Sequence, residues 1–293
     1  MSARILVPVD GSAESRRAFT HAITRFPDED IVLLHVIEPF ADHTKAGGHA
    51  GGRSNRIFEE RQQLLDEIVE REHEGSGTVS TELVYGRPAH VIPRYVETNG
   101  IDEVVIGSRG RGGTTRLLLG SVAEAVVRRV PVPVTVIRST DDSDADRHRS
   151  PARVLVPFDR SVCSRSALDY AFERFPDATV TALFVTYPSS ETYEHVESGD
   201  DLDDVFTAAE AAERETRDVF AVARRIAERN GREIDTTTEA GSPSRGILEW
   251  IGENDLDHVV IGCHGRSGVA RWLLGSVAET VVRRSPVPVT TVK

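Results

Sequence analysis

Glycine and serine residues recur at one fixed spacing, Gly-x2-Gly-x9-Gly-Ser, in two places in the chain. The two copies are Gly107, Gly110, Gly120 and Ser121, and Gly262, Gly265, Gly275 and Ser276. Because glycine has no Cβ, such a loop can turn sharply at its first two glycines and leave its N–H groups open to phosphate oxygens. The serine is expected to cap the following helix at its positive end, where anions bind. The spacing therefore predicts two phosphate-binding loops.

The sequence around each loop is duplicated as well. Leu117–Ile137 and Trp272–Val292 share sixteen identities in twenty-one positions. The displacement between copies is 149 residues from Asp10 to Asp159 and 155 residues from Gly107 to Gly262, so six residues entered the second half, in or beside its second helix. A duplication this close indicates two copies of one ligand-binding domain.

An aspartate ends the first apolar run of each half, at Asp10 and Asp159. In an open parallel sheet, ligands gather at the carboxyl ends of the strands, where the winding reverses. Asp10 and Gly107 both fall at such ends, as do Asp159 and Gly262, so we expect each aspartate to face its glycine loop. The alternative is an aspartate that serves a turn or a helix cap.

Arginines lie within the same loops, and a guanidinium group can neutralise phosphate oxygens. They are Arg109, Arg111 and Arg116 in the first copy, and Arg266 and Arg271 in the second. Exposed loop arginines that serve solubility are the alternative. His264 replaces Arg109 in the aligned second loop, which predicts weaker phosphate binding there near neutral pH.

Short apolar strands alternate with helical patterns along both halves. In the first half we expect helices from Ser12 to Arg25, from Ser54 to Glu74, from Pro88 to Asn99 and from Ser121 to Val130. Alternation with near-continuous Val and Ile runs predicts a parallel sheet covered on both faces. His35, on the second strand, is expected to be a core or edge histidine; a catalytic base is the alternative.

The expected domains are residues 1–138 and 151–293, joined by a solvated linker at 139–150. The stretches Phe40–Asn55 and Pro188–Asp204 are predicted to be mobile loops near the mouth of each site. Asp42, His43 and His49 could ligate a metal, but solvated loop residues are the simpler interpretation.

Charge and composition exclude several classes of protein. Asp and Glu outnumber Lys and Arg by 47 to 35, for a net charge of -12, which argues against nucleic acid or an anionic membrane as partner. Lys45 and Lys293 are the only lysines; a halophile's acidic surface or a GC-rich genome would explain this. Cys163 and Cys263 form no CxxC or zinc spacing, which favours reduced structural thiols. With no signal peptide and no long apolar run, a cytoplasmic location is expected.

Rival motifs are absent from the sequence: there is no GxxxxGK[ST], no GxGxxG after the first strand, no GxSxG and no HExxH. The strand-end aspartate, the glycine loop and the closing PVPV segment instead resemble the universal stress protein family, here as a tandem pair. The resemblance implies two Rossmann-like domains of the adenine-nucleotide-alpha-hydrolase type, each an open five-stranded parallel sheet with helices on both faces. Family members that retain the motif bind ATP, and members that lack it do not.

The resemblance also assigns roles to residues. Those expected around ATP, ADP or AMP in the first copy are Pro8, Val9, Asp10, Val36, Gly107, Arg109, Gly110, Gly120, Ser121 and Val122, and in the second copy Pro157, Phe158, Asp159, Val185, Gly262, Gly265, Gly275, Ser276 and Val277. The valines at 36 and 185 would pack on adenine, and the aspartates would lie near the ribose or a bound Mg or Mn ion. The second copy departs from the first at Arg160, which stands in place of Gly11 and would reach the ligand or close the pocket.

The last strands, Val132–Ile137 and Val287–Val292, carry alternate prolines, which favours sheet edges. In the resembled family this edge pairs antiparallel with a second domain, so the two halves are expected to form an intramolecular pseudo-dimer, and a homodimer is a further option. The sequence favours an ATP-binding stress-response sensor or switch with an unknown protein partner. The alternatives are a slow ATP hydrolase or adenylyl-transfer enzyme, and a scaffold that holds its nucleotide permanently.

Overall fold

The computed structural model describes residues 2–38, 50–72, 77–110, 119–138, 151–186, 202–265 and 274–293. The chain separates into two compact units, residues 1–150 and 151–293. Several residues considered above lie outside the described ranges: Asp42, His43, His49, Arg111, Arg116, Arg266, Arg271 and the predicted linker at 139–150.

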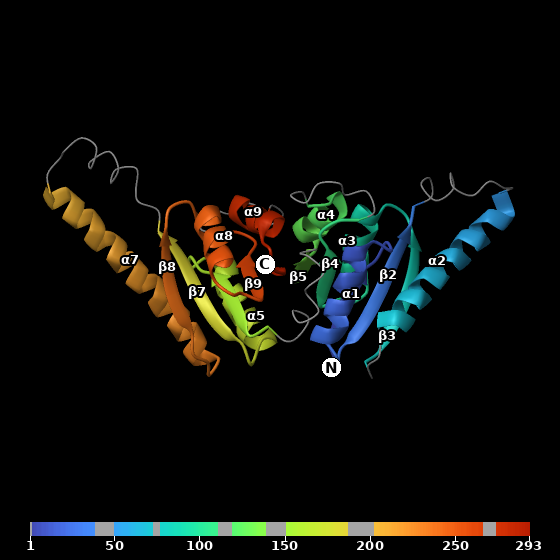
Figure 1. Ribbon diagram of the computed structural model, residues 1–293, viewed down its shortest axis with the longest axis horizontal. Coiled ribbons are helices and arrows are strands. Elements are labelled where there is room, and N and C mark those ends of the chain that lie inside the picture. The colour runs from blue at the N-terminus through green and yellow to red at the C-terminus, as the bar shows by residue number, and fades with distance from the viewer. Residues whose placement is uncertain are drawn as a thin grey trace. The chain divides into compact units, whose positions relative to one another are not determined.

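Strands and helices alternate in both units (Figure 1). The first unit contains β1 (Arg4–Pro8), α1 (Ala13–Arg25), β2 (Asp30–Ile37), α2 (Ala50–Glu72), β3 (Val79–Tyr85), α3 (Pro88–Thr98), β4 (Glu103–Gly107), α4 (Ser121–Arg129) and β5 (Val134–Ile137). The second contains β6 (Arg153–Pro157), α5 (Val162–Arg174), β7 (Thr179–Thr186), α7 (Leu202–Arg229), β8 (Asp235–Ala240), α8 (Pro243–Glu253), β9 (His258–Gly262), α9 (Ser276–Arg284) and β10 (Val289–Val292).

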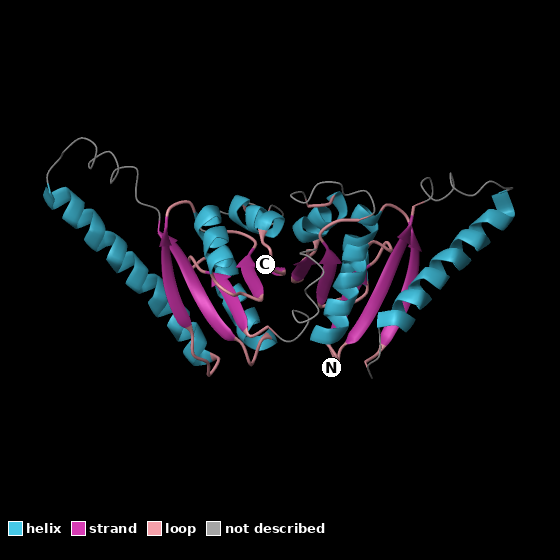
Figure 2. Cartoon of the chain, viewed as in Figure 1, coloured by secondary structure: helices cyan, strands magenta, loops and turns pink. Residues whose placement is uncertain are grey.

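The strand order is β3-β2-β1-β4-β5 in the first unit and β8-β7-β6-β9-β10 in the second. Neighbouring strands within each unit run parallel. Contacts of α1 with α2 and of α3 with α4 group the helices into two layers, one on each face of the sheet (Figure 2). The order reverses between β1 and β4, so the loops that follow these strands meet at one edge of the sheet.

Local signals explain where several helices begin. The Ser12 hydroxyl accepts a hydrogen bond from the Ser15 N–H at 3.3 Å and caps α1, and Ser161 caps α5 in the same way, with the Ser164 N–H at 3.2 Å. Pro88 is the first residue of α3, where its missing N–H leaves no helical hydrogen bond unmade.

Several predicted boundaries are wrong. The predicted loop Phe40–Asn55 runs into α2, which already begins at Ala50, and the predicted loop Pro188–Asp204 runs into α7, which begins at Leu202. Gly51 and Gly52 cost about 1 kcal/mol each relative to alanine, which a helix of 23 residues tolerates near its end. The last strand, predicted to begin at Val132, begins at Val134, because Pro133 lacks an N–H and takes part only through its carbonyl, 3.0 Å from the Val104 nitrogen.

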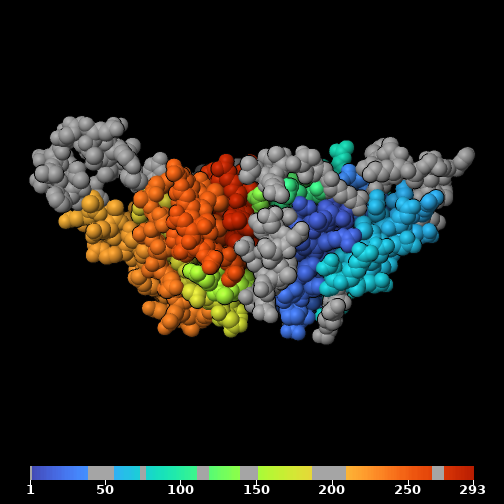
Figure 3. Space-filling model, viewed as in Figure 1, coloured from blue at the N-terminus to red at the C-terminus, as the bar shows by residue number. Residues whose placement is uncertain are grey.

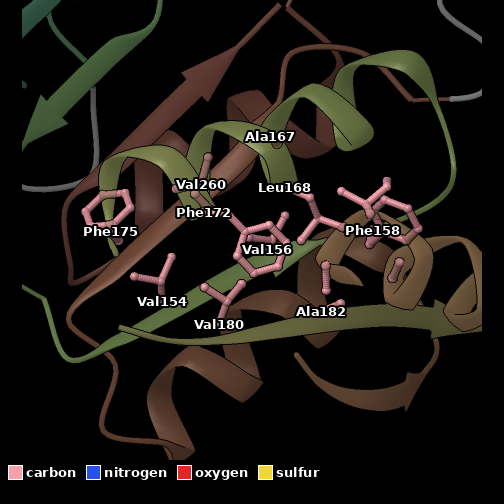
Figure 4. Close-up of a cluster of buried hydrophobic side chains, with 14 of the residues drawn as sticks. Val154, Val156, Phe158, Ala167, Leu168, Phe172, Phe175, Val180, Ala182 and Val260 are labelled. Carbon is pink, nitrogen blue, oxygen red and sulfur yellow. The ribbon is translucent and has the colours of Figure 1, made fainter. Parts of the chain in front are cut away.

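Each unit has its own apolar core between its sheet and the helices of one face. In the second unit, Phe172 and Phe175 of α5 lie over Val154 and Val156 of β6, and Phe158 follows at the end of that strand (Figure 4). In the first unit α2 buries Leu65 and Ile68 and exposes charged side chains on the surface seen in light blue in Figure 3. These cores hold the strand ends that carry the predicted site.

Candidate functional site

Asp10 lies between β1 and α1 and uses its two carboxylate oxygens differently. Its Oδ1 accepts hydrogen bonds from the Ser12 N–H at 3.0 Å and the Ser12 hydroxyl at 2.6 Å. Its Oδ2 faces the glycine loop, because a Cβ added to Gly110 would lie 2.5 Å from it. Asp10 therefore accepts the hydrogen bonds of the turn before α1 with one oxygen and faces the glycine loop, as predicted, with the other.

The second unit repeats this arrangement around Asp159. The Ser161 N–H donates to Asp159 Oδ1 at 2.9 Å, and a Cβ added to Gly265 would lie 3.0 Å from Oδ2. The Ser161 hydroxyl instead donates to the carbonyl of His264 at 3.2 Å, which ties the start of α5 to the glycine loop.

The first glycine of each motif makes room for a helix. A Cβ on Gly107 would lie 2.8 Å from the backbone carbon of Glu14, and one on Gly262 would lie 2.6 Å from that of Cys163. None of the motif glycines that the structure describes has a positive φ, so a left-handed backbone conformation is not what requires glycine at these positions. Gly107 is instead the last residue of a strand that a helix backbone approaches closely.

The third glycine of each motif begins a helix whose N-terminus has no side-chain cap. Gly120 is the N-cap of α4 and Gly275 that of α9, and neither helix has a side-chain cap hydrogen bond. The cap hydroxyl predicted for Ser121 is therefore wrong: Ser121 and Ser276 are the first helical residues and are exposed. Among the helices whose caps are described, α1 and α5 close their N-termini with serine, whereas α3, α4, α8 and α9 have no side-chain cap; of these four, α4 and α9 are the two that begin at the glycine motif, with the positive end of the helix dipole there.

Hydrogen bonds hold these open ends against the strands that precede them. The Gly120 N–H donates to the Ser108 carbonyl at 2.8 Å, and the Gly275 N–H donates to the Cys263 carbonyl at 2.7 Å. A Cβ on Gly120 would lie 3.2 Å from that carbonyl oxygen, so a larger residue would push the helix away. The arrangement brings Asp10, Gly107, Gly110, Gly120 and Ser121 together in the first unit, with their counterparts together in the second.

Arg109 pairs with an acidic side chain that the sequence did not single out. Its Nη2 lies 3.1 Å from Glu14 Oε1 in α1, and the side chains are 12% and 17% exposed. The aligned pair in the second unit is Cys163 and His264, so the residue type changes at both positions between the copies.

Several apolar residues predicted at the nucleoside lie in the cores. Val9 is 4% exposed and packs in the core of the first unit, with its carbonyl oxygen 2.7 Å from His35 Nδ1. Phe158 is 2% exposed in the second core. Pro8 is buried as well. The predicted His35 position in the core is confirmed.

The remaining predicted residues end strands or begin helices. Val36 is buried at the end of β2, and Val185 of β7 lies against α8, where a Cβ on Gly246 would be 3.3 Å from it. Val122, Val277 and Pro157 are half-buried. A cavity of about 340 Å³ borders the end of β7; it is lined by Thr186, Ala212, Glu213, Thr216, Arg217 and Thr238, none of them predicted site residues.

Arg160 adopts the left-handed backbone conformation of the glycine it replaces. Its φ is 67°, and that of Gly11 is 83°. The Arg160 guanidinium points toward α7, where its Nη2 lies 4.0 Å from Glu215 Oε1.

Each unit has one carboxylate beside its glycine loop that could bind a divalent cation, Asp10 in the first and Asp159 in the second. Among the described residues, no group of three or more His, Cys, Asp or Glu side chains is arranged to hold a metal ion. Mg²⁺ is commonly held by one or two carboxylates together with substrate phosphates and water, and the Oδ2 atoms of Asp10 and Asp159, which face the glycine loops, fit that donor set.

A tandem pair of parallel sheets, each with this glycine loop at its switch point, defines the class of protein. The model of the universal stress protein family matches residues 1–138 and 152–293, so the chain belongs to that family. A universal stress protein of Mycobacterium tuberculosis strain H37Rv is 32% identical over 302 residues, covering 97% of this chain and 95% of its own length. One of Mycolicibacterium smegmatis is 28% identical over 303 residues, covering 99% and 96%.

A solved structure supports the assignment over the full length. The crystal structure of a universal stress protein from Archaeoglobus fulgidus matches with a TM-score of 0.64 and 26% identity, covering 99% of this chain and 96% of that one. The two Rossmann-like domains expected from the sequence are confirmed. No helix in the described parts of the chain is both long and apolar enough to cross a membrane.

Proposed function

We propose that this universal stress protein binds ATP in each of its two units and acts in the cytoplasm as a nucleotide-dependent sensor or switch. The observation that carries the proposal is the uncapped N-terminus of α4 beside the Asp10 carboxylate, repeated at α9 beside Asp159. Free N–H groups at a helix start bind phosphate, and an acidic group at the adjoining strand end suits a ribose hydroxyl or a phosphate-bound cation.

The ligand would lie across the switch point of each sheet. Its phosphates would meet the backbone of Gly110, Gly120, Ser121 and Val122, and its adenine would lie toward Val36. Because Val9 and Phe158 are core residues, contacts at those positions would involve the main chain. The family resemblance, in which members with this motif bind ATP, supports the same placement.

A binding function fits the described residues better than an enzymatic one. A hydrolase needs a base within hydrogen-bond reach of the attacking water. His35 is buried against the Val9 carbonyl, and Glu14 is paired with Arg109. Intact ATP after long incubation with the protein and magnesium is therefore expected; steady phosphate or pyrophosphate release that is lost in Asp10→Ala and Asp159→Ala would support the enzyme instead.

Nucleotide binding can be tested on the whole chain. Freshly purified protein is denatured and any released nucleotide is identified by mass, and calorimetry with ATP, ADP and AMP then gives stoichiometry and affinity. Two sites are expected, and Gly110→Val should weaken one of them because its side chain would collide with Asp10 Oδ2. Asp66→Ala, an exposed carboxylate on α2, is the matched control for Asp10→Ala. Absence of binding by all three nucleotides would overturn the proposal.

A further inference from the structure

A cationic residue follows the last strand of each unit. Arg138 comes directly after β5, and Lys293, one of the chain's two lysines, comes directly after β10. Strand pairing places both beside the start of the glycine loop, since Gly107 pairs with Ile137 and Gly262 with Val292. The next backbone hydrogen bonds continue this register, from the Ser108 N–H to the Ile137 carbonyl at 2.7 Å and from the Cys263 N–H to the Val292 carbonyl at 2.8 Å.

Each of these residues lies near a second cationic or titratable group from the loop. Burial and then the positive charge of Arg109 lower the pKa of Arg138. In the second unit, burial and then the charge of Lys293 lower the pKa of His264, and burial lowers the pKa of Lys293 itself. Positive groups held close together in partly dry surroundings repel one another; Glu14 offsets part of this repulsion at Arg109, and a ligand phosphate between the cations of either unit would offset more.

Buried polar atoms at the same places lack partners among the described residues. They are Arg109 Nε, His264 Nε2 and Ser108 Oγ. Ser108 is 3% exposed, and its hydroxyl occupies the position that the Cys263 thiol takes in the second unit. Buried polar atoms are normally hydrogen-bonded, so such atoms beside a phosphate loop indicate where ligand oxygens would lie.

We propose that Arg109 with Arg138, and His264 with Lys293, form a cationic corner in each unit that binds the distal phosphates of a nucleotide and so favours triphosphate over monophosphate. This inference rests on the proposed function and adds a specificity determinant to it. The open helix N-terminus serves any phosphate, whereas the corner, one strand further along the sheet edge, adds charge-assisted hydrogen bonds for a longer phosphate chain.

The test removes the strand-end cations and compares two nucleotides by calorimetry at one pH and one salt concentration. In the full-length double variant Arg138→Gln/Lys293→Gln, ATP affinity should fall roughly tenfold or more, because hydrogen bonds to charged groups are lost. AMP affinity should change less than about twofold, since AMP lacks the distal phosphates. The exposed arginines of α3 and α9 supply the matched control, Arg94→Gln/Arg284→Gln.

Conservative exchanges separate charge from packing. Arg138→Lys and Lys293→Arg each copy the residue of the other unit and should retain most of the preference for ATP. Equal loss of ATP and AMP binding in the double variant, or no loss of either, would overturn the cationic corner.

Inorganic tripolyphosphate separates the failure of this inference from failure of the proposed function. Wild-type protein that binds tripolyphosphate through Arg138 and Lys293 but binds no adenine nucleotide would overturn the proposed function and support the corner. Binding of ATP and AMP with a preference that ignores both cations would support the function and overturn the corner. Binding of none of these compounds would overturn both.

Discussion

The two glycine loops have the same backbone arrangement but different side chains around it. The helix-start hydrogen bond is 2.8 Å long at Gly120 and 2.7 Å long at Gly275. The aligned side chains beside it are Glu14, Ser108, Arg109 and Arg138 in the first unit, and Cys163, Cys263, His264 and Lys293 in the second. Duplication thus kept the main-chain groups that would face phosphate, while the charges beside them diverged.

This divergence makes the second loop the one whose charge depends on conditions. Arg109 has a carboxylate partner in Glu14, with its Nη2 3.1 Å from Glu14 Oε1. Burial and the charge of Lys293 lower the pKa of His264, and Cys163 stands where the carboxylate would be. We therefore expect the first site to be insensitive to pH and the second to respond to it.

The thiols offer the largest expected contrast, and both belong to the second unit. Cys263 is 1% exposed, and burial raises its pKa to about 11, whereas Cys163 is half-buried in the first turn of α5. At pH 8 about one Cys263 in a thousand would be thiolate and its side chain is buried, so an aromatic disulfide reagent should modify the more exposed Cys163 at least about a hundredfold faster. The rates are followed by absorbance. Rapid labelling that persists in Cys163→Ser and disappears in Cys263→Ser would reverse the assignment.

Substitution of the first motif glycine tests what the loops share. Gly107→Ala and Gly262→Ala place a Cβ within 2.8 Å and 2.6 Å of a helix backbone, and overpacking of this kind costs about 1–3 kcal/mol. Trp250 and Trp272 both belong to the second unit, so tryptophan fluorescence during thermal unfolding reports Gly262→Ala, while circular dichroism reports both variants.

The control for these variants is Gly252→Ala in α8, where an added Cβ meets nothing within 4 Å. It should be neutral or stabilising by up to about 1 kcal/mol, as expected for alanine in a helix. A Gly262→Ala protein that unfolds at the wild-type temperature would show that α5 can move away from the strand.

Features set by short-range chemistry could be predicted from the sequence. Ser12 caps α1, Pro88 begins α3 and the Val/Ile runs form parallel strands, because each of these depends on residues a few positions apart. The position of Asp10 beside the glycine loop also followed, since parallel strands bring their carboxyl ends to one edge.

Features set by contacts between distant segments could not be predicted. The role of Gly107 depends on the backbone of Glu14, and the pairing of Arg109 depends on the side chain of that same residue. Neither contact has a spacing in the sequence that would reveal it. Because serine is a common helix cap, the sequence favours Ser121 as the cap, whereas the N-cap residue of α4 is Gly120.

The pH dependence of nucleotide binding should differ between the units by a smaller factor. Burial and Lys293 lower the pKa of His264, so the free imidazole is neutral at pH 7; a bound phosphate would raise that pKa. Affinity at the second site should therefore rise as the pH falls from about 7.5 to 5.5, by up to roughly tenfold, and be lost again as the pH rises.

His264→Arg is the reference for this measurement, since its side chain does not titrate over this range. Any pH dependence that remains in this variant comes from other groups, including the phosphate itself. Asp159, Cys163, Cys263 and Lys293 surround the loop and remain unchanged in both proteins. If the calorimetric pH profiles of His264→Arg and wild type are identical, the imidazole does not contribute to nucleotide binding.

The smallest expected effect concerns the residue after each strand-end aspartate. Arg160 is the one described non-glycine residue with positive φ, a conformation that costs about 1–2 kcal/mol. Arg160→Gly removes this strain but adds freedom to the unfolded chain worth about 0.5–1 kcal/mol, so the net gain in stability should be below about 1 kcal/mol. Arg160→Ala removes the 4.0 Å contact with Glu215 and keeps the backbone strain. Because that ion pair is partly exposed, little change in the free energy of unfolding is expected. Urea unfolding followed by tryptophan fluorescence measures the stability of both variants. If Arg160→Ala gained as much stability as Arg160→Gly, the cost would lie in the arginine side chain and not in the left-handed backbone conformation, which Arg160 has in common with Gly11.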